Sequence, residues 1–375
     1  MKHYTFTSES VTEGHPDKVA DLISDTIADY IIDNNQSHRA AIETLVTTNK
    51  VYVSGEYKSS KNVSKDSVDP IIRKTIQDIG YDQEGFSYKN VDIDIMLDQQ
   101  STDIALGTDN FGAGDQGMMF GYACNETEDL MPSPIHYSHK ITKALSDARH
   151  GGASWLGPDG KSQITFLYSD INKPVGISNI VCSTQHDDNM PIEEVRKKVE
   201  EIIKPTVEGY DTSEIEFLIN PTERFVIGGP AGDTGLTGRK IIVDTYGGYA
   251  PHGGGAFSGK DCVKVDRSGA YMSRYLAKNI VASNVASNIA KNATVQLSYA
   301  IGIPEPTSLY VYADGKVRTD IADWFTNNID LTPLGIINKF DLFNIKLTDT
   351  TNYGHFGDSN LPWEVIDLTD EIKLL

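Results

Sequence analysis

Apolar residues near the start of the chain recur first at helical spacing and then at strand spacing. Val19, Ile23 and Ile27 fall on one helical face, and Pro16 suits a first turn, so a helix is predicted to begin near Pro16. Two apolar runs, 41–47 and 50–57, flank a short Thr48-Asn49 turn, which is typical of a hairpin. A helix over about 65–79 and an alternating strand over 91–97 are predicted to follow.

The same order returns twice along the chain. The second round is predicted as a helix at 134–149, strands at 162–168 and 175–184, a helix at 191–207 and a strand at 214–219. The third is predicted as a helix at 267–290, strands at 293–301 and 308–312, and a helix at 319–327. Three similar α/β domains would explain this rhythm, but so would an ordinary α/β alternation.

Length and composition indicate a folded protein of several domains. The chain has 375 residues, whereas single hydrophobic cores stop growing near roughly 250 to 300 residues, so two or three domains are expected. The first residues lack a signal-like apolar core, and no run is long enough to span a bilayer, so a cytoplasmic protein without membrane contact is expected. Cys124, Cys182 and Cys262 lie far apart, and we predict that they are reduced and non-catalytic.

The distribution of charge favours a phosphate ligand over a nucleic-acid partner. A net charge of −20 opposes non-specific attraction to nucleic acid or anionic membranes. Residues 239–267 are an exception, because they hold more basic than acidic side chains. The basic residues there are Arg239, Lys240, Lys260, Lys264 and Arg267, and the acidic ones are Asp244, Asp261 and Asp266.

Two glycine-rich segments, 228–240 and 252–260, overlap this basic region. Glycines let a backbone approach an anion closely, and Lys and Arg add charge, so phosphate binding is predicted. Residues 254–260 match the start of a P-loop, but Asp261 stands where Ser or Thr must coordinate magnesium. The nearest predicted strand ends near Tyr246, and helical spacing resumes only at Arg267, so a Walker-type fold is not expected. A surface loop rich in turn residues is the alternative.

The segment 8–18 joins a short strand to the first helix. A helix amino terminus attracts phosphate oxygens, and His15 there is suited to donate a hydrogen bond to a leaving oxygen. Asp17 is suited to bind Mg²⁺. A capping or packing role for His15 is the equally weighted alternative.

Two further glycine motifs carry weaker signals. Residues 112–117 match G-x-G-x-x-G, but no strand directly precedes them and Met118 begins a strand-like run, so a plain turn is favoured. Residues 159–162, Asp-Gly-Lys-Ser, are predicted to form a β-turn first and a phosphate clamp second.

Together, the segments 14–18, 112–117, 228–240 and 252–260 resemble the signature segments of the S-adenosylmethionine synthetase family, bacterial type, and the resemblance runs from Phe6 to about Trp363. It implies an α+β fold of three similar domains, each a β-sheet packed with helices, in a pseudo-threefold arrangement. The expected domains are 1–99, 110–225 and 227–366, with segments interleaved in space. A homodimer with active sites at the subunit interface is also implied, often as a dimer of dimers in a homotetramer.

The implied reaction is attack of the methionine sulfur on C5′ of ATP, followed by hydrolysis of the released triphosphate to pyrophosphate and phosphate. Such a reaction needs no general base, because a thioether sulfur carries no proton, and it depends on alignment and on stabilising the departing polyanion. Two Mg²⁺ per site and K⁺ are the implied cofactors.

The resemblance also assigns roles residue by residue. The implied catalytic residues are His15, Lys161, Arg239, Lys240 and Lys260. The implied ATP-binding residues are these five together with Asp159, Gly160, Arg224, Phe225, Asp233 and Ala256. The implied methionine-binding residues are Glu56, Gln100, Asp233 and Lys264, and the implied metal ligands are Asp17 for Mg²⁺, Glu43 for K⁺, and additionally Asp266 and Asp115.

Three departures from the family pattern are visible. Cys262 stands where proline is usual, and Glu223 stands where glycine is usual, so altered loop rigidity with retained chemistry is expected. The segment 102–111 is short compared with the gating loop of many relatives. Two rival functions stay open: an ATP-dependent kinase or ATPase, with attack at the γ-phosphorus, and a nucleotide-binding module without turnover.

Overall fold

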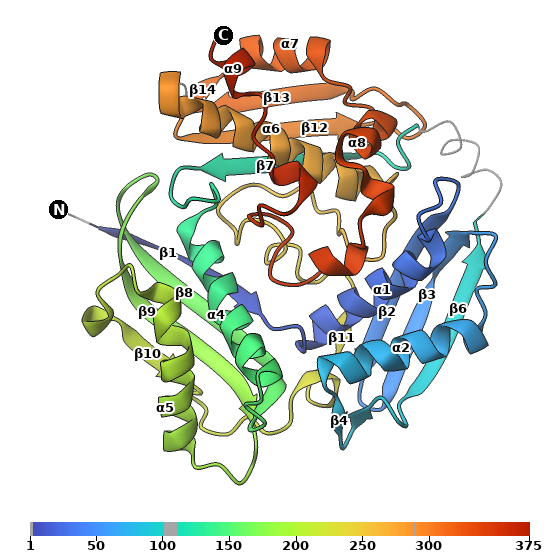
Figure 1. The fold of residues 1–375 in the computed structure, drawn as a ribbon, viewed down its shortest axis with the longest axis vertical. Coiled ribbons are helices and arrows are strands. Elements are labelled where there is room, and N and C mark those ends of the chain that lie inside the picture. The colour runs from blue at the N-terminus through green and yellow to red at the C-terminus, as the bar shows by residue number, and fades with distance from the viewer. Residues whose placement is uncertain (1–2, 101–111, 288–289) are drawn as a thin grey trace.

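The computed structural model of the chain describes residues 3–100, 112–287 and 290–375. Within these ranges three four-stranded sheets, each with its helices, surround a common centre (Figure 1). This arrangement confirms the predicted mixed α and β fold of three similar units. The short gating-loop segment predicted at 102–111 lies outside the described residues.

The bounds of the elements follow the chain from the amino terminus. The first part holds β1 (Tyr4–Val11), α1 (Pro16–Ile32), β2 (Arg39–Thr47), β3 (Lys50–Lys58), α2 (Lys65–Ile79), β4 (Asp82–Gln83), β5 (Phe86–Ser87) and β6 (Asp92–Gln99). The middle part holds β7 (Gly117–Cys124), α4 (Ser133–His150), β8 (Leu156–Asp170), β9 (Lys173–His186), α5 (Ile192–Ile203) and β10 (Glu216–Ile219). The last part holds β11 (Gly235–Leu236), α6 (Val265–Ser287), β12 (Asn292–Tyr299), β13 (Ser308–Ala313), β14 (Lys316–Val317), α7 (Thr319–Asn328), α8 (Pro333–Phe340) and α9 (Thr369–Ile372).

The three large sheets share one plan. In each, an edge strand pairs antiparallel with a central hairpin: β11 with β2–β3, β1 with β8–β9, and β7 with β12–β13. A parallel strand, β6 or β10, completes the first two sheets, whereas the short antiparallel β14 completes the third. The edge strands β11, β1 and β7 each come from a part of the chain that is distant from their hairpin. The repeated rhythm of the sequence therefore reflects three similar units that exchange their edge strands.

Helices cover one face of each sheet and leave the other face outward. Alternate residues of β12 are buried against α6, and alternate residues of β2 against α1. A shared apolar core joins the β2 and β12 sheets, and a second core lies between the β8 sheet and helices α4 and α5. Large apolar side chains stay exposed on the outward faces of the β2 and β12 sheets. They include Tyr52, Met96, Leu236, Met118, Tyr310 and Tyr312.

Two local predictions are wrong, and each has a physical reason. Residues before Tyr246 form turns instead of a strand, because Asp244 turns inward to pair with the buried Lys18 at 2.7 Å. Residues 159–162 lie inside β8 instead of a β-turn, because Lys161 pairs with Val11 of β1 and Gly160 with Thr184 of β9.

The helix predicted over 191–207 keeps α-helical geometry only to Ile203. A 3-10 turn follows over Lys204–Val207, where Pro205 has no N–H to continue the ladder. The helix predicted to end at residue 290 is described as far as Ser287.

The three cysteines form no disulfide, as predicted; all three are also buried, and burial raises the pKa of each thiol. None of the described helices is long and apolar enough to cross a membrane.

Candidate active site

His15 lies where the loop after β1 enters α1. Its Nδ1 accepts a hydrogen bond from the Asp17 backbone N–H at 3.1 Å, so the ring caps the helix. Burial, together with the charge of Lys240, lowers the His15 pKa to about 3, so the ring is neutral near pH 7. A neutral ring whose Nδ1 accepts a hydrogen bond carries its proton on Nε2. Capping and ligand binding are therefore compatible, because they use different ring nitrogens.

Asp17 holds the two cations of the first glycine-rich segment. Its carboxylate is 1% exposed, lies 2.5 Å from Lys240 Nζ and 3.4 Å from Arg239 Nε, and accepts the Leu236 N–H at 3.0 Å. Burial alone would raise the Asp17 pKa, but the bonds from Lys240 and Leu236 outweigh it and the pKa is lowered. The carboxylate is therefore ionised and pairs with both cations at the start of α1.

Asp159, Gly160 and Lys161 follow one another on β8, beside the same loop. Asp159 Oδ2 accepts the Gly229 N–H at 2.7 Å, and burial raises the Asp159 pKa to about 6 against that bond. Lys161 is half exposed on the outward face of the sheet, 2.8 Å from Glu9. The charge of Lys161, like that of Lys240, lowers the pKa of His15.

The segment that carries Arg224 and Phe225 is fixed through its backbone by His186. The Phe225 N–H donates to His186 Nε2 at 3.2 Å, and the Phe225 carbonyl accepts the His186 N–H at 2.9 Å. The Phe225 ring is partly exposed, and Arg224 extends to Asp188 at 2.8 Å. Glu223 has a φ of +70°, a left-handed conformation that glycine adopts without strain.

Asp233 lies in the turn that follows the Gly229–Ala231 3-10 helix. Its side chain is exposed and its Oδ1 accepts the Thr234 N–H at 2.8 Å. The carboxylate therefore faces solvent next to the loop that Asp159 holds.

Both glycine-rich segments form backbone hydrogen bonds with the edge of β2 that does not pair with β3. Near one end of β2, Gly235 and Leu236 pair as β11 with Val46 and Leu45. Near the other end, Ile42 donates to the Gly259 carbonyl at 2.9 Å. The segments also meet directly, because a Cβ on Gly238 would lie 2.7 Å from the Ala256 Cβ. One strand thus aligns the two cationic segments.

A cavity of about 160 Å³ opens at the end of β3. Glu56, Gln100 and Lys264 line it together with Gly114, next to Asp115, and with the buried Asp261. Lys264 Nζ lies 3.0 Å from Asp261, and Gln100 Oε1 is buried without a hydrogen-bond partner among the described residues. The structure therefore brings Glu56, Gln100 and Lys264 together, although they lie far apart in the sequence.

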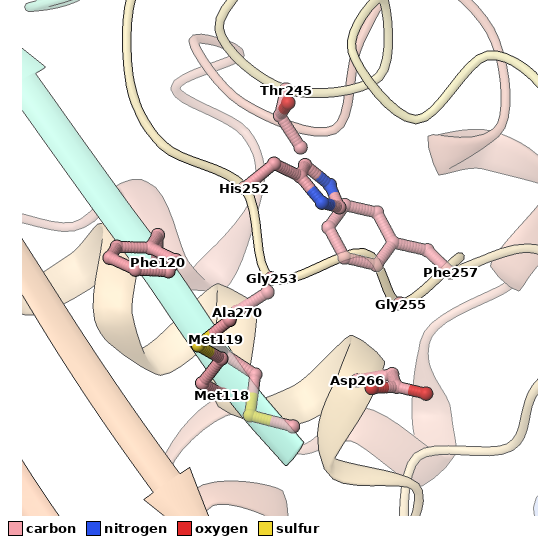
Figure 2. A pocket seen from close by; sticks show the side chains of 10 residues that line it. All are labelled: Met118, Met119, Phe120, Thr245, His252, Gly253, Gly255, Phe257, Asp266 and Ala270. Carbon is pink, nitrogen blue, oxygen red and sulfur yellow. The ribbon is translucent and has the colours of Figure 1, made fainter.

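Lys260, at the end of the second glycine-rich segment, forms an ion pair at 2.5 Å with Asp266 in the first turn of α6. Figure 2 shows Asp266 beside a crevice that His252, Phe257 and Met118 also line. Its volume of about 10 Å³ holds one water molecule at most, so this crevice is a packing defect and not a ligand site. Glu43 lies nearby on β2 with part of its side chain exposed; partial withdrawal of its carboxylate from water, together with Asp21 and Glu56, raises its pKa against the charge of Lys260.

Comparisons with known proteins identify the family. Models of the N-terminal, central and C-terminal domains of S-adenosylmethionine synthetase match residues 3–102, 110–225 and 227–365. The chain belongs to the S-adenosylmethionine synthetase family. S-adenosylmethionine synthases of Rhodospirillum centenum and Parvibaculum lavamentivorans are 50% and 49% identical over 386 residues, covering 99% of this chain and 98% of each relative. A solved S-adenosylmethionine synthetase from Campylobacter jejuni, described as unusual, superposes with a TM-score of 0.92 at 39% identity, covering 99% of both chains.

In this synthetase-family chain, the predicted site residues fall into two groups. The first group surrounds the start of α1 and contains His15, Asp17, Asp159, Gly160, Lys161, Arg224, Phe225, Asp233, Arg239 and Lys240. The second lies on the outward face of the β2 sheet and beside the cavity, and contains Glu43, Glu56, Gln100, Asp115, Lys260, Lys264 and Asp266. No hydrogen bond or ion pair found in the described parts of the chain joins a member of one group to a member of the other.

Sequence reasoning missed three aspartates of α1 that anchor distant loops; Asp21 and Asp25 anchor the glycine-rich segments of the site, and Asp29 anchors a turn away from it. Asp21, Asp25 and Asp29 continue from Asp17 along α1 at four-residue spacing, and their carboxylates accept backbone N–H groups of Gly238, Gly259 and Leu347. The spacing is visible in the sequence, but it resembles a solvated charged face. Their burial depends on loops more than 200 residues away, which no local pattern reveals.

Proposed function

We propose that this chain is a methionine adenosyltransferase that forms S-adenosylmethionine from ATP and L-methionine and then hydrolyses the bound triphosphate to pyrophosphate and phosphate. The proposal rests on one observation above all: the cations of the site are already held in place by acids. Lys240 and Arg239 pair with Asp17, Lys260 with Asp266, and Lys161 with Glu9. These pairs gather the cations at the site before substrate binds, and the cations can exchange the acids for phosphate oxygens, so they suit a triphosphate leaving group.

In the first step, a sulfur lone pair forms the new bond to C5′ while the C5′–O bond breaks and its electron pair moves to the triphosphate. The sulfur becomes a sulfonium and the leaving oxygen gains charge. His15 Nε2–H, free because Nδ1 caps α1, donates a hydrogen bond to that oxygen. Arg239, Lys240, Lys161 and Lys260 stabilise the departing phosphates. Arg224, Phe225 and Ala256 border the nucleoside, with the Phe225 ring against adenine.

Methionine is proposed to occupy the cavity at the end of β3. Its ammonium group meets acceptors there, since Gln100 Oε1 has no hydrogen-bond partner among the described residues and Glu56 adds its carboxylate oxygens. Lys264 binds the substrate carboxylate. Asp233, which belongs to the first group of site residues, also contacts the methionine. The cavity thus presents charges of both signs, as an amino acid requires.

Mg²⁺ and K⁺ are suited to the acidic side chains of the site, because the lysines and arginines that now pair with them would bind phosphate instead. Among the described residues no three His, Cys, Asp or Glu side chains come close enough to hold a metal alone. Mg²⁺ usually combines one or two carboxylates with substrate phosphates and water, so Asp17 and Asp266, with Asp115, are suited to hold two ions once ATP is bound. The ions would neutralise phosphate charge. The carboxylate of Glu43 is suited to K⁺.

A second copy of the chain is proposed to complete each site. Within one chain, no hydrogen bond or ion pair among the described residues joins the two groups, and members of both, such as Lys161 and Glu56, lie on outward sheet faces. Those faces also expose apolar side chains such as Met96, 60% exposed, which a symmetric partner would cover. The homodimer follows from this reading, and its further pairing to a tetramer is proposed from the family resemblance alone.

The chemistry is tested by mass spectrometry after incubation with ATP, methionine, Mg²⁺ and K⁺. The sulfonium product with pyrophosphate and phosphate is expected. ADP as the main product would instead establish a kinase or ATPase.

Lys260→Ala separates an enzyme from a module that only binds nucleotide. Removing one charge-stabilising donor is expected to lower kcat by about 10² to 10³ with the fold intact. Lys346→Ala is the matched control, since Lys346 is an exposed lysine 3.9 Å from Asp349 and away from the site. Equal turnover of both variants would remove Lys260 from the mechanism.

The shared site is tested by complementation. Lys161→Ala impairs the first group and Lys260→Ala the second, and the two variants are co-expressed with different tags so that mixed dimers can be purified. A mixed dimer carries one site with both defects and one intact site, so about half of wild-type activity is expected. Activity no higher than that of the parent variants would place each site within one chain.

A further inference from the structure

The four aspartates of α1 form a row, each matched to a backbone donor from another part of the chain. Asp17 accepts the Leu236 N–H at 3.0 Å, Asp21 the Gly238 N–H at 2.8 Å, and Asp25 the Gly259 N–H at 2.8 Å. Asp29 accepts the N–H groups of Leu347 and Thr348 at 2.8 and 3.1 Å. Because residues four apart share one helical face, this helix spaces the loops that carry the cations.

We infer that Asp21 is a positioning residue that sets the place of Arg239 and Lys240 during adenosyl transfer. The inference rests on the proposed function. Asp21 is fully buried, and its Oδ1 holds the N–H of Gly238, the residue immediately before Arg239. Gly238 has a φ of +79°, so this bond fixes the turn that sends both cations toward Asp17.

Asp21 matters most in the substrate complex. In the free protein Asp17 also holds this segment, through Leu236 and the Lys240 ammonium. Once Asp17 binds Mg²⁺ and Lys240 binds phosphate, those bonds are exchanged, whereas the bond from Gly238 to Asp21 faces away from the ligand and persists. The pairing of β11 with β2 and Thr237, whose Oγ1 accepts the Thr44 N–H at 2.9 Å, also tie this segment to β2.

Removal of the Asp21 charge does not leave the buried Lys18 ammonium without an acidic partner. Lys18 is shared by two acids, at 3.1 Å from Asp21 and 2.7 Å from Asp244. Asp21→Asn therefore still leaves Lys18 paired, and its amide oxygen can accept the same Gly238 N–H. Asp21→Ala removes the acceptor and the charge together. The two variants differ in the hydrogen bond and share the loss of charge.

The experiment compares wild type, Asp21→Asn and Asp21→Ala by kcat, by KM for each substrate and by thermal midpoint. A displacement of about 1 Å at a reacting group can cost up to 10²-fold, so a fall in kcat of about tenfold or more is expected for Asp21→Ala. The KM for methionine should change less than about twofold, because the cavity at the end of β3 is untouched. Asp21→Asn should retain kcat within about threefold.

Asp29→Ala is the matched control, because Asp29 belongs to the same row but holds the distant turn at Leu347 and Thr348. It should lower the thermal midpoint without changing kcat. If Asp21→Ala does not fold, Asp21→Ser replaces it, since its hydroxyl is too short to reach Gly238.

Three results would overturn the role of Asp21: wild-type kcat in Asp21→Ala, equal losses in the Asn and Ala variants, or an equal loss in Asp29→Ala. Failure of the proposed function is distinguishable, because the wild-type protein would then form no sulfonium product at all.

Discussion

Replacement of His15 by asparagine separates its two uses in this structure. The Nδ1 atom caps α1 through the Asp17 N–H, and the Nε2–H is free for substrate. Asparagine is among the best helix caps, whereas alanine costs about 1 kcal/mol at such a position. His15→Asn should therefore keep the stability of the wild type near pH 8 and lose only the donor.

The expected loss in rate follows from that single donor. Removing one hydrogen-bond donor to a developing oxyanion typically lowers kcat by about 10² to 10³. The assay is steady-state S-adenosylmethionine formation at saturating ATP and methionine, with thermal unfolding measured in parallel. His15→Ala should show a similar kcat and a lower midpoint. A His15→Asn enzyme with wild-type kcat would refute the role of Nε2.

A pH series provides an independent check. The folded-state pKa of His15, about 3, lies below its unfolded value of about 6.5. The unfolded chain thus binds the extra proton, so the stability from neutral His15 is complete above about pH 6.5 and is lost as pH falls toward 3. The asparagine variant should overtake wild type in stability below about pH 5. Parallel stability curves of the two proteins would contradict the burial of a neutral ring.

Two further predictions concern the loops around the site. Glu223→Gly should raise the free energy of unfolding by about 1 kcal/mol, since it relieves a left-handed conformation at φ +70°; Glu223→Ala is the control, and an equal gain in both would implicate the carboxylate instead. Asp159 has a folded pKa of about 6, above its unfolded value of about 3.9, so its neutral form stabilises the fold at low pH and that stability is lost as pH rises toward 6. Asp159→Asn keeps an acceptor for the Gly229 N–H but does not titrate. Measured by urea unfolding, its free energy of unfolding should rise relative to that of wild type by on the order of 2 to 3 kcal/mol between pH 4 and 7.5. A difference that stays constant with pH would exclude this linkage.

Local patterns predicted the elements that depend on local interactions. The helix at Pro16 begins where the proline and the apolar spacing place it, and the Thr48-Asn49 hairpin turn lies between β2 and β3. Apolar spacing failed at residues 241–246, because a buried ion pair between Lys18 and Asp244 decides the conformation there. An ion pair between residues so far apart in the sequence does not change the local spacing of apolar residues, so the spacing cannot reveal it.

The prediction of the candidate site depended more on the family resemblance than on local patterns in the sequence. Spacing and charge indicated His15, Asp17 and the two glycine-rich segments, because a helix start and a run of glycines and cations are local features. Nothing local connects Glu56 with Gln100 and Lys264, which meet only because β3, the end of β6 and the segment before α6 converge. The roles of all these residues, and the domain limits 1–99, 110–225 and 227–366, stay predictions.

The exchanged edge strands constrain the order in which the chain can fold during synthesis. The β8 sheet has all its strands once residue 219 is made, but the β2 sheet lacks its edge until Gly235 and Leu236 emerge. The strand β7 must wait for β12, which begins at Asn292. Although domains generally fold from the amino terminus, here the middle sheet is the first that can be completed on the ribosome. The first hairpin stays without its edge partner for nearly two hundred residues of translation, a period in which a chaperone would protect it from pairing with other chains.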